Sequence, residues 1–298
     1  MNNTHTAAPV PQAQADLPQR WGVPTLQQRL QALEPHLEVE VMVSVGSTNS
    51  TLLERAATAS RQAGPSSACP PFRTRLLVAE SQTQGRGRQG RRWHASPGAS
   101  LTFSMALTLA PQDWSGLSLA VGVALAQALD AAPQPSIALK WPNDLWLRDA
   151  NAPAGGRKLG GVLIETTGWA SGKERVCVIG VGLNVQAQAV LEASSGVASL
   201  QEIWPQASAA AALARVAPAL LQGVRQFERD GFAGVKTAFA QRDLLQGQTV
   251  TTTQAGLPGG RAEGVDGVGA LLVRSPDGTL HRLVGGEVSV RPLFGRVS

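Results

Sequence analysis

Apolar residues recur along this chain in runs that predict strands and helices in alternation. Alternating or continuous apolar runs of strand length predict strands at 37–45, 75–80 and 100–110. Residues 51–63 and 207–243 have the spacing of helices. Residues 115–132 are apolar all round, which predicts a core helix with Ser115 as its N-cap. The larger part of the chain is therefore expected to be an α+β domain.

The middle of the chain adds three further elements. The segment "IALKWPNDLWL" (137–147) predicts a two-strand hairpin that bends at Pro-Asn-Asp. "KLGGVLIET" and "RVCVIGVGLNV" follow as two strands long enough to be central in a sheet. Residues 187–199 are small and predict a loop.

The two ends of the chain differ from the middle in composition and in the elements they predict. Residues 1–20 are rich in Pro, Gln, Ala and Thr and predict a disordered tail, and 25–36 predict a short helix. After about Gln246, short strand candidates are divided by glycines, with a strong hairpin turn at "SPDG" (275–278). We therefore expect a tail and short helix over 1–38, a main domain over 39–244 and a small β-barrel over 245–298.

Composition narrows the class of protein. The chain has 298 residues, 43% of them hydrophobic, and a formal charge of +5. Its two cysteines, Cys69 and Cys177, lie far apart and predict neither a disulfide framework nor a metal site. We find no signal peptide and no apolar run that reads as a membrane span. A cytoplasmic location without membrane association is the simplest expectation.

The most unusual stretch is "SQTQGRGRQGRRWHASPG", 81–98, which follows a predicted buried strand. Its glycines allow the backbone to approach a ligand closely. Its four arginines repel one another unless an anion binds, and guanidinium groups suit phosphate or carboxylate. A solvated basic turn or a nucleic-acid-binding arm remains an alternative. Trp93 at the end of the loop favours a ligand site, because it offers an aromatic wall.

Four other segments carry polar groups beside apolar strands. They are "GSTNS" (46–50), "KWPND" (140–144), Lys158 at the start of its strand, and Asn184 in "GVGLNV". Each has an ordinary structural explanation: a helix N-cap, a surface ion pair, a solvated strand end or a buried hydrogen-bonded bridge. Only four lysines occur in the chain, and Lys140 and Lys158 are two of them.

Taken together and in order, these motifs resemble the biotin protein ligases. The resemblance rests on G-S-T-N, E-S-Q-T-x-G-R-G-R-x-G-R-x-W, K-W-P-N-D, K-L-x-G-V-L-I-E and G-x-G-L-N, and it runs from about residue 44 to 186. It implies a catalytic domain like that of class II aminoacyl-tRNA synthetases, followed by a small SH3-like barrel. The loop before residue 75 and the segment between Asp144 and Lys158 are longer than is usual in that family.

The resemblance also implies a function and a set of site residues. The family joins biotin to ATP as biotinyl-5′-AMP and passes the biotinyl group to a lysine of a carrier domain. The implied catalytic residues are Lys158, Arg86, Arg88 and Asp144. The implied biotin contacts are Ser47, Thr48, Asn49, Gln82, Arg86, Gly87, Arg88, Trp93 and Lys158. The implied nucleotide contacts are Arg88, Arg91, Lys140, Asn143, Asp144 and Asn184.

Cofactors and partners follow from the same resemblance. We expect ATP and Mg²⁺ as substrates together with biotin, no resident metal, and the biotin carboxyl carrier domain of acetyl-CoA carboxylase as the protein partner. Because only about 40 residues precede the main domain, we expect no specific DNA binding; a homodimer is possible. Residues 83–93 are expected to be mobile until a ligand orders them. A lipoate or octanoate protein ligase, or a basic nucleic-acid-binding protein, remains an alternative.

Overall fold

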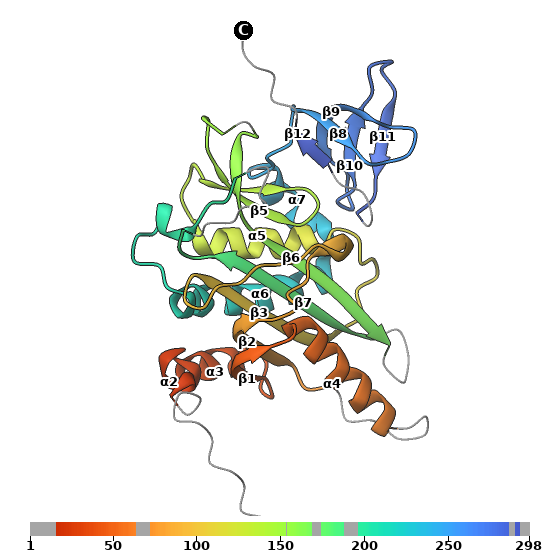
Figure 1. The fold of residues 1–298 in the computed structure, drawn as a ribbon. Coiled ribbons are helices and arrows are strands. Elements are labelled where there is room, and N and C mark those ends of the chain that lie inside the picture. Colours follow the sequence, from red (N-terminus) through yellow and green to blue (C-terminus); the bar gives the residue numbers. More distant parts are fainter. Residues whose placement is uncertain are drawn as a thin grey trace, which may run out of the picture.

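A seven-stranded mixed sheet forms the centre of the larger part of the molecule (Figure 1). The computed structural model describes residues 16–63, 72–152, 154–168, 174–187, 196–285 and 290–292. The strand order is β1-β2-β3-β7-β6-β5-β4, with β1 and β2 parallel and the other pairs antiparallel. The strands are β1 (Glu38–Val45), β2 (Arg75–Gln82), β3 (Ser100–Leu109), β4 (Ile137–Lys140), β5 (Asp144–Arg148), β6 (Gly156–Gly168) and β7 (Arg175–Asn184).

Helices cover both faces of this sheet (Figure 1). One face carries α5 and α6, with α2 and α3 beside them, while α4 packs on the other face against β2, β3, β6 and β7. The helices are α2 (Leu17–Arg20), α3 (Val23–Gln31), α4 (Thr48–Ala63), α5 (Leu117–Leu129), α6 (Ala209–Asp230) and α7 (Lys236–Ala240). No helix in the described ranges combines the length and apolarity needed to cross a membrane.

The alternation of side chains along β3 divides the sheet into an apolar and a partly polar face. Leu101, Phe103 and Met105 are buried in the core with α5 and α6. Successive side chains of a strand point to opposite faces, so Thr102 and Ser104 lie on the α4 side. The part of that face beyond the cover of α4 is where polar groups gather.

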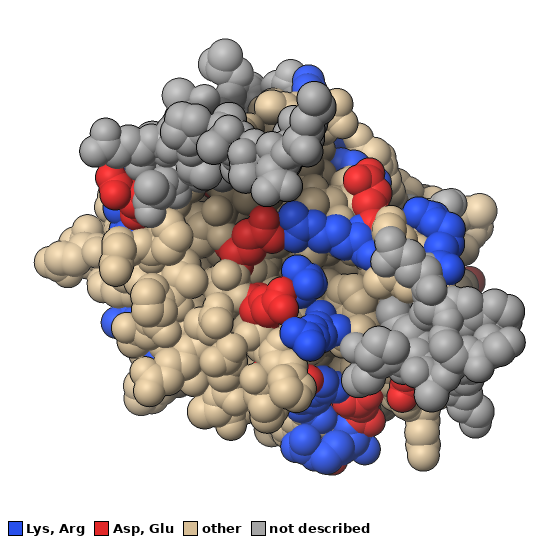
Figure 2. All heavy atoms as spheres, turned by 90° about the horizontal axis from the view of Figure 1, so that it is seen from below, with Lys and Arg blue, Asp and Glu red and all other residues tan. Residues whose placement is uncertain are grey.

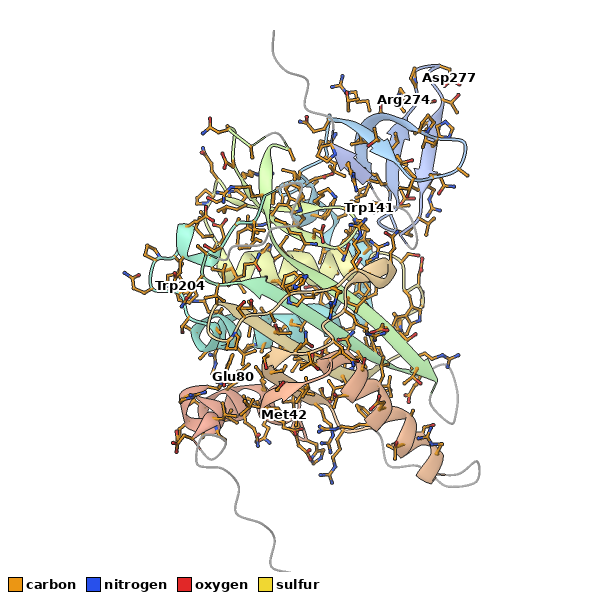
Figure 3. The ribbon with its side chains drawn as sticks, viewed as in Figure 1. Met42, Glu80, Trp141, Trp204, Arg274 and Asp277 are labelled. Carbon is orange, nitrogen blue, oxygen red and sulfur yellow. The ribbon has the colours of Figure 1, made fainter. Side chains whose placement is uncertain are left out.

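The C-terminal part is a five-stranded antiparallel sheet in the order β11-β10-β9-β8-β12. Its strands are β8 (Thr249–Thr252), β9 (Gly259–Val265), β10 (Leu271–Arg274), β11 (Leu280–Leu283) and β12 (Val290–Pro292), and the predicted turn at 275–278 joins β10 to β11. Trp141 fixes this sheet to the main domain: its buried indole donates to the carbonyl of Gly269 at 3.1 Å (Figure 3).

Several local predictions need correction. Residues 17–20, assigned to the tail, form α2, because Leu17 is fully buried in the core. The predicted helix 25–36 is α3, which begins at Val23 and ends at Gln31. Ser115 does not cap α5; Gly116 precedes the helix in the left-handed conformation (φ 79°). The rest of the predicted tail, Cys69 and most of the 187–199 loop lie outside the described residues.

The connection between the two parts runs along the edge of the large sheet. Leu139 of β4 donates its N–H to the carbonyl of Arg242 at 2.7 Å and accepts from Leu244 N–H at 3.0 Å. Between them lies Asp243, a residue that is 7% exposed. Its Oδ1 accepts from Leu245 N–H at 2.8 Å, but its Oδ2 has no hydrogen-bond partner within the described part of the chain. Burial therefore raises the pKa of Asp243 to about 6.

This buried carboxyl predicts a dependence of stability on pH. A pKa that is higher in the folded state favours folding below the ordinary value of 3.8, and this contribution is lost as the pH rises through 6. Asp243→Asn should remove that loss, so the variant should gain up to about 3 kcal/mol relative to wild type between pH 4 and pH 7.5. Denaturant unfolding at both pH values measures the difference. Asp230→Asn, at an exposed position, is the control; a gain of equal size there would contradict the assignment.

Candidate active site

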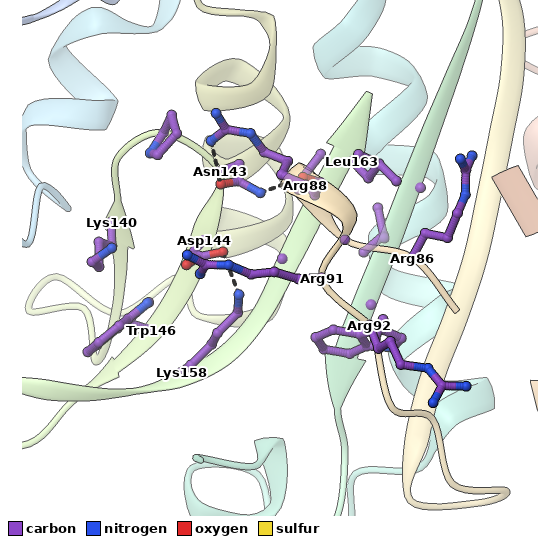
Figure 4. A pocket seen from close by; sticks show the side chains of 18 of the residues that line it. Arg86, Arg88, Arg91, Arg92, Lys140, Asn143, Asp144, Trp146, Lys158 and Leu163 are labelled. Atoms are coloured by element: carbon purple, nitrogen blue, oxygen red, sulfur yellow. Dashed lines mark hydrogen bonds and ion pairs between the residues drawn. The ribbon is translucent and has the colours of Figure 1, made fainter. Parts of the chain in front are cut away.

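A cavity of about 790 Å³ opens on the polar face of the large sheet (Figure 4). This volume lies in the range of sites that hold one or two small molecules. Its walls come from the start of α4, the arginine loop (residues 85–93), the β4–β5 hairpin and β6. The C-terminal sheet also reaches it through residues 290–292. Segments far apart in the sequence therefore meet at this one place.

The floor of the cavity is a row of four residues across four strands. Thr102 of β3 pairs with Gly182 of β7, which pairs with Gly161 of β6, which pairs with Asp144 of β5. Directly paired residues share a face of the sheet, so the two central glycines leave a trough between Thr102 and Asp144. Side chains from elsewhere can then lie flat against the backbone.

Trp93 fills one half of this trough. A Cβ added to Gly182 would lie 2.4 Å from the indole ring, so only glycine leaves room for it. The backbone N–H of Trp93 donates to the carbonyl of Gly85 at 3.0 Å, which ties the ring to the arginine loop. The indole Nε1 is buried and has no hydrogen-bond partner among the residues that the structure describes, and the same holds for Thr102 Oγ1 beside it. Two unsatisfied polar atoms on a cavity wall favour a polar ligand.

An ion pair lies over the other half of the trough. Lys158 Nζ is 2.7 Å from Asp144 Oδ1, and both groups are close to Gly161 (Figure 4). The side chains are 36% and 17% exposed, so the pair faces the cavity rather than bulk solvent. Asn184 holds the strand beneath it, since its Nδ2 donates to the carbonyl of Lys158 at 3.3 Å. Asn184 is buried, and its predicted contact with a nucleotide stays a prediction.

The arginine loop closes on itself as a small hairpin above this pair. Gly87 N–H donates to the carbonyl of Arg91 at 2.7 Å, and the turn passes through Gln89 and Gly90, both with positive φ. Arg88 donates to Asn143 Oδ1 at 3.0 Å, and burial lowers the pKa of its guanidinium. Arg91 reaches toward Asp144 and Lys158 (Figure 4). Arg86 and Arg92 point away from them.

Lys140 adds a buried cation at the far end of the cavity. Its side chain lies over the ring of Trp146, with Nζ 5.5 Å from the ring centre, and the residue is 9% exposed. Burial lowers its pKa, although Asp144 opposes this. Positive charge therefore exceeds negative charge on the wall that contains Lys140, Lys158, Arg88, Arg91 and Asp144. This excess suits an anionic ligand. Among the residues that the structure describes, no cluster of His, Cys, Asp and Glu could hold a metal ion.

The opposite end of the cavity is polar and uncharged. Ser47 lies just before α4, and its Oγ accepts from Ser50 N–H at 3.4 Å, so it caps the helix as well as lining the cavity. Thr48 N–H donates to Gln82 Oε1 at 2.7 Å. This bond turns the Gln82 amide nitrogen away from α4, and that nitrogen makes no hydrogen bond to the described part of the chain. The structure thus brings Ser47, Thr48, Asn49 and Gln82 together, as the sequence predicts.

Sequence reasoning missed several contributors to the site. Arg157 lines the cavity and joins three segments, because it pairs with Asp149 and Glu202 and donates to the carbonyl of Val197 at 3.0 Å. Trp146 and Arg291 also line the cavity. The alternating pattern of β3 could have indicated Thr102 and Ser104. Only the strand register shows that Gly180 and Gly182 face the site.

Comparisons with known proteins agree with this geometry. Residues 71–184 match the Biotin/lipoate A/B protein ligase family, and residues 247–291 match the Biotin protein ligase C terminal domain. The chain is 33% identical to the bifunctional ligase/repressor BirA of Escherichia coli, over 85% of this chain and 74% of that protein. The chain belongs to the biotin protein ligase family.

Other members of the biotin protein ligase family show the same likeness. A biotin--[acetyl-CoA-carboxylase] ligase of Paracoccus denitrificans is 33% identical over 68% of this chain and 85% of its own length. The biotin protein ligase of Aquifex aeolicus, solved with biotin and ATP, superposes with a TM-score of 0.65 at 25% identity and covers 86% of this chain and 99% of that one. The predicted fold class, a catalytic α+β domain followed by a small β domain, is thereby confirmed.

The glycine floor gives a direct test of the site in this biotin protein ligase. Gly182→Ala should expel the Trp93 ring, since the new Cβ would overlap it. Amide protection in residues 85–93 should then fall by about tenfold or more, because burying an aromatic side chain contributes about 1.5–3 kcal/mol. Hydrogen exchange read by mass spectrometry measures this. Gly168→Ala in β6, where a Cβ meets nothing within 4 Å, is the matched control. Unchanged protection in Gly182→Ala would show that the ring does not depend on this contact.

Proposed function

We propose that this protein is a biotin–[acetyl-CoA-carboxylase] ligase. It activates biotin with Mg·ATP and transfers the biotinyl group to a lysine of a biotin carboxyl carrier domain. In the first step a carboxylate oxygen of biotin bonds to the α-phosphorus and pyrophosphate leaves. In the second, the unprotonated amine of the carrier lysine attacks the acyl carbon, an amide forms and AMP leaves. The observation that carries the proposal is Lys158, held by Asp144 in the trough of a cavity of the required size.

Charge arrangement supports this chemistry. The first step brings together two anions, the biotin carboxylate and the α-phosphate, and their repulsion opposes reaction. Cations fixed before the substrates arrive stabilise the transition state without reorganisation. Lys158 lies between the uncharged end of the cavity and the cationic wall, and Arg88 and Arg91 approach from above. We assign biotin to the end formed by Ser47, Thr48 and Gln82, and the triphosphate to the end formed by Lys140, Arg88 and Arg91.

Asp144 can serve the reaction in more than one way. Its carboxylate is already engaged by Lys158 at 2.7 Å. It orients the ammonium group, and its second oxygen is available to the Mg²⁺ that enters with ATP or to the proton of the carrier lysine. Trp93 and the arginine loop cover the trough, and such a cover protects a mixed anhydride from water.

The alternatives have weaker support. The family that matches residues 71–184 includes lipoate ligases, but residues 247–291 match the C-terminal domain of biotin protein ligases specifically. Cys177 is fully buried, and burial raises the pKa of its thiol to about 12, which argues against the cysteine chemistry of an octanoyltransferase. A nucleic-acid-binding surface would need a continuous basic face. The face in Figure 2 instead shows basic side chains beside acidic ones.

Two interactions and the domain limits stay predictions. We propose that the chain binds no DNA specifically, which gel-shift titration tests, and that a homodimer is possible, which sedimentation tests. β1 lies at the end of the sheet order and pairs with β2 alone among the described strands. We also propose that the catalytic domain ends near residue 244, where the chain leaves the sheet edge.

The reaction is tested by intact mass spectrometry of a biotin carrier domain incubated with the protein, biotin and Mg·ATP. The carrier should gain one biotinyl group. Lys158→Ala should slow adenylate formation by on the order of 10² or more, since it removes the central cation. Lys236→Ala, an exposed lysine in α7, is the matched control and should react like wild type. Wild-type turnover in Lys158→Ala would remove Lys158 from the reaction, and an unmodified carrier with wild type would refute the function.

A further inference from the structure

A chain of hydrogen bonds runs beneath the uncharged end of the cavity. Ser104 Oγ lies 2.6 Å from both Thr48 Oγ1 and Asn49 Oδ1. Asn49 Nδ2 donates to Glu165 Oε2 at 2.9 Å and to the carbonyl of Leu163 at 3.2 Å. Gly180 makes this possible, because a Cβ there would lie 2.2 Å from Asn49 Oδ1.

The number of available protons fixes which group donates in each of these hydrogen bonds. The Asn49 oxygen can only accept, so the single proton of the Ser104 hydroxyl goes to Asn49 and Ser104 accepts from Thr48. The Thr48 hydroxyl also lies 3.2 Å from Gln82 Oε1, and the 2.6 Å contact with Ser104 is the shorter of the two. The Asn49 amide then has its oxygen and both its N–H groups engaged within the protein. A side chain satisfied in this way is a connector and has no donor left for a ligand. Gln82, whose oxygen accepts from Thr48 N–H, is left to present its amide nitrogen.

This series of hydrogen bonds ends on the arginine loop. Arg86 Nη2 lies 3.0 and 2.9 Å from the two oxygens of Glu165, and Oε2 is the same oxygen that accepts from Asn49. Glu165 does not line the cavity, so it touches neither end of a bound substrate directly. Arg86 is a loop arginine that forms an ion pair with Glu165. It thereby fixes the start of the loop, while Arg88 and Arg91 lie toward Asn143 and Asp144.

We propose that Glu165 is a positioning residue, which acts through Arg86 to hold the arginine loop over the biotin end of the cavity. The proposal rests on the proposed function, since it takes biotin to occupy the end beside Thr48 and Gln82. Arg86 in this account anchors the loop, and the charge offered to the phosphate comes from Arg88, Arg91 and Lys158. Loss of the anchor should loosen the cover over biotin more than it slows the chemical step.

The test is Glu165→Gln, which keeps the size of the side chain and removes its charge. The KM for biotin should rise by about fivefold, since a partly exposed ion pair contributes up to about 1 kcal/mol. The KM for ATP and kcat should change less than threefold, and free biotinyl-5′-AMP should escape faster. Amide exchange in residues 86–92 should also increase. Glu40→Gln, which breaks an Arg–Glu pair with Arg55 away from the cavity, is the matched control.

A double-mutant cycle separates this role from a general structural one. If Glu165 acts through Arg86, then Arg86→Gln with Glu165→Gln should have the same KM for biotin as Arg86→Gln alone. Effects that multiply would overturn the proposal, and so would a Glu165→Gln variant with the wild-type KM. Arg86 is exposed, so its substitution does not endanger folding. If wild type and Glu40→Gln formed no adenylate, the proposed function itself would fail, which is a different result.

Discussion

The site depends on one contact, the ion pair of Lys158 and Asp144 over the glycine row of the large sheet. Gly161 and Gly182 provide the space, and the register of β5, β6 and β7 brings Asp144 to the edge of that space. An ammonium group fixed there remains partly exposed to the cavity while its geometry is set by a carboxylate. Such a cation can meet two anions without first moving into position, which is the condition for electrostatic stabilisation of their reaction.

Charged side chains from neighbouring elements surround the pair of Lys158 and Asp144. Lys140, Arg88 and Arg91 add positive charge to one side, and burial lowers the pKa values of Lys140 and Arg88. Arg86 pairs with Glu165. The loop thus has an anchored end and a charged end, although its sequence repeats one motif. The C-terminal sheet completes the wall with Arg291, and Trp141 fixes that sheet to the main domain.

Much of this site follows from the sequence because the motifs lie at the ends of predictable strands. The sequence predicts Lys158 near the start of a strand and Asp144 in the Pro-Asn-Asp bend, whereas the pairing of the two is a finding of the structure. The roles of Gly180, Gly182 and Glu165 could not be predicted, since they depend on which residues face each other across strands far apart in the sequence. The sequence predicts Ser115 as the cap because a side-chain cap is the common start of a helix, whereas Gly116, with its left-handed backbone, precedes α5.

The most direct test of the account is a crystal structure with a non-hydrolysable analogue of biotinyl-5′-AMP. We expect Lys158 Nζ within hydrogen-bonding distance of the linkage between the acyl group and the phosphate, with Asp144 still beside it and the ring of Trp93 over the biotin chain. The biotin ring should lie beside Gln82, and Arg86 should remain on Glu165. An analogue bound with Lys158 turned out of the trough, or with biotin at the Lys140 end, would contradict the account.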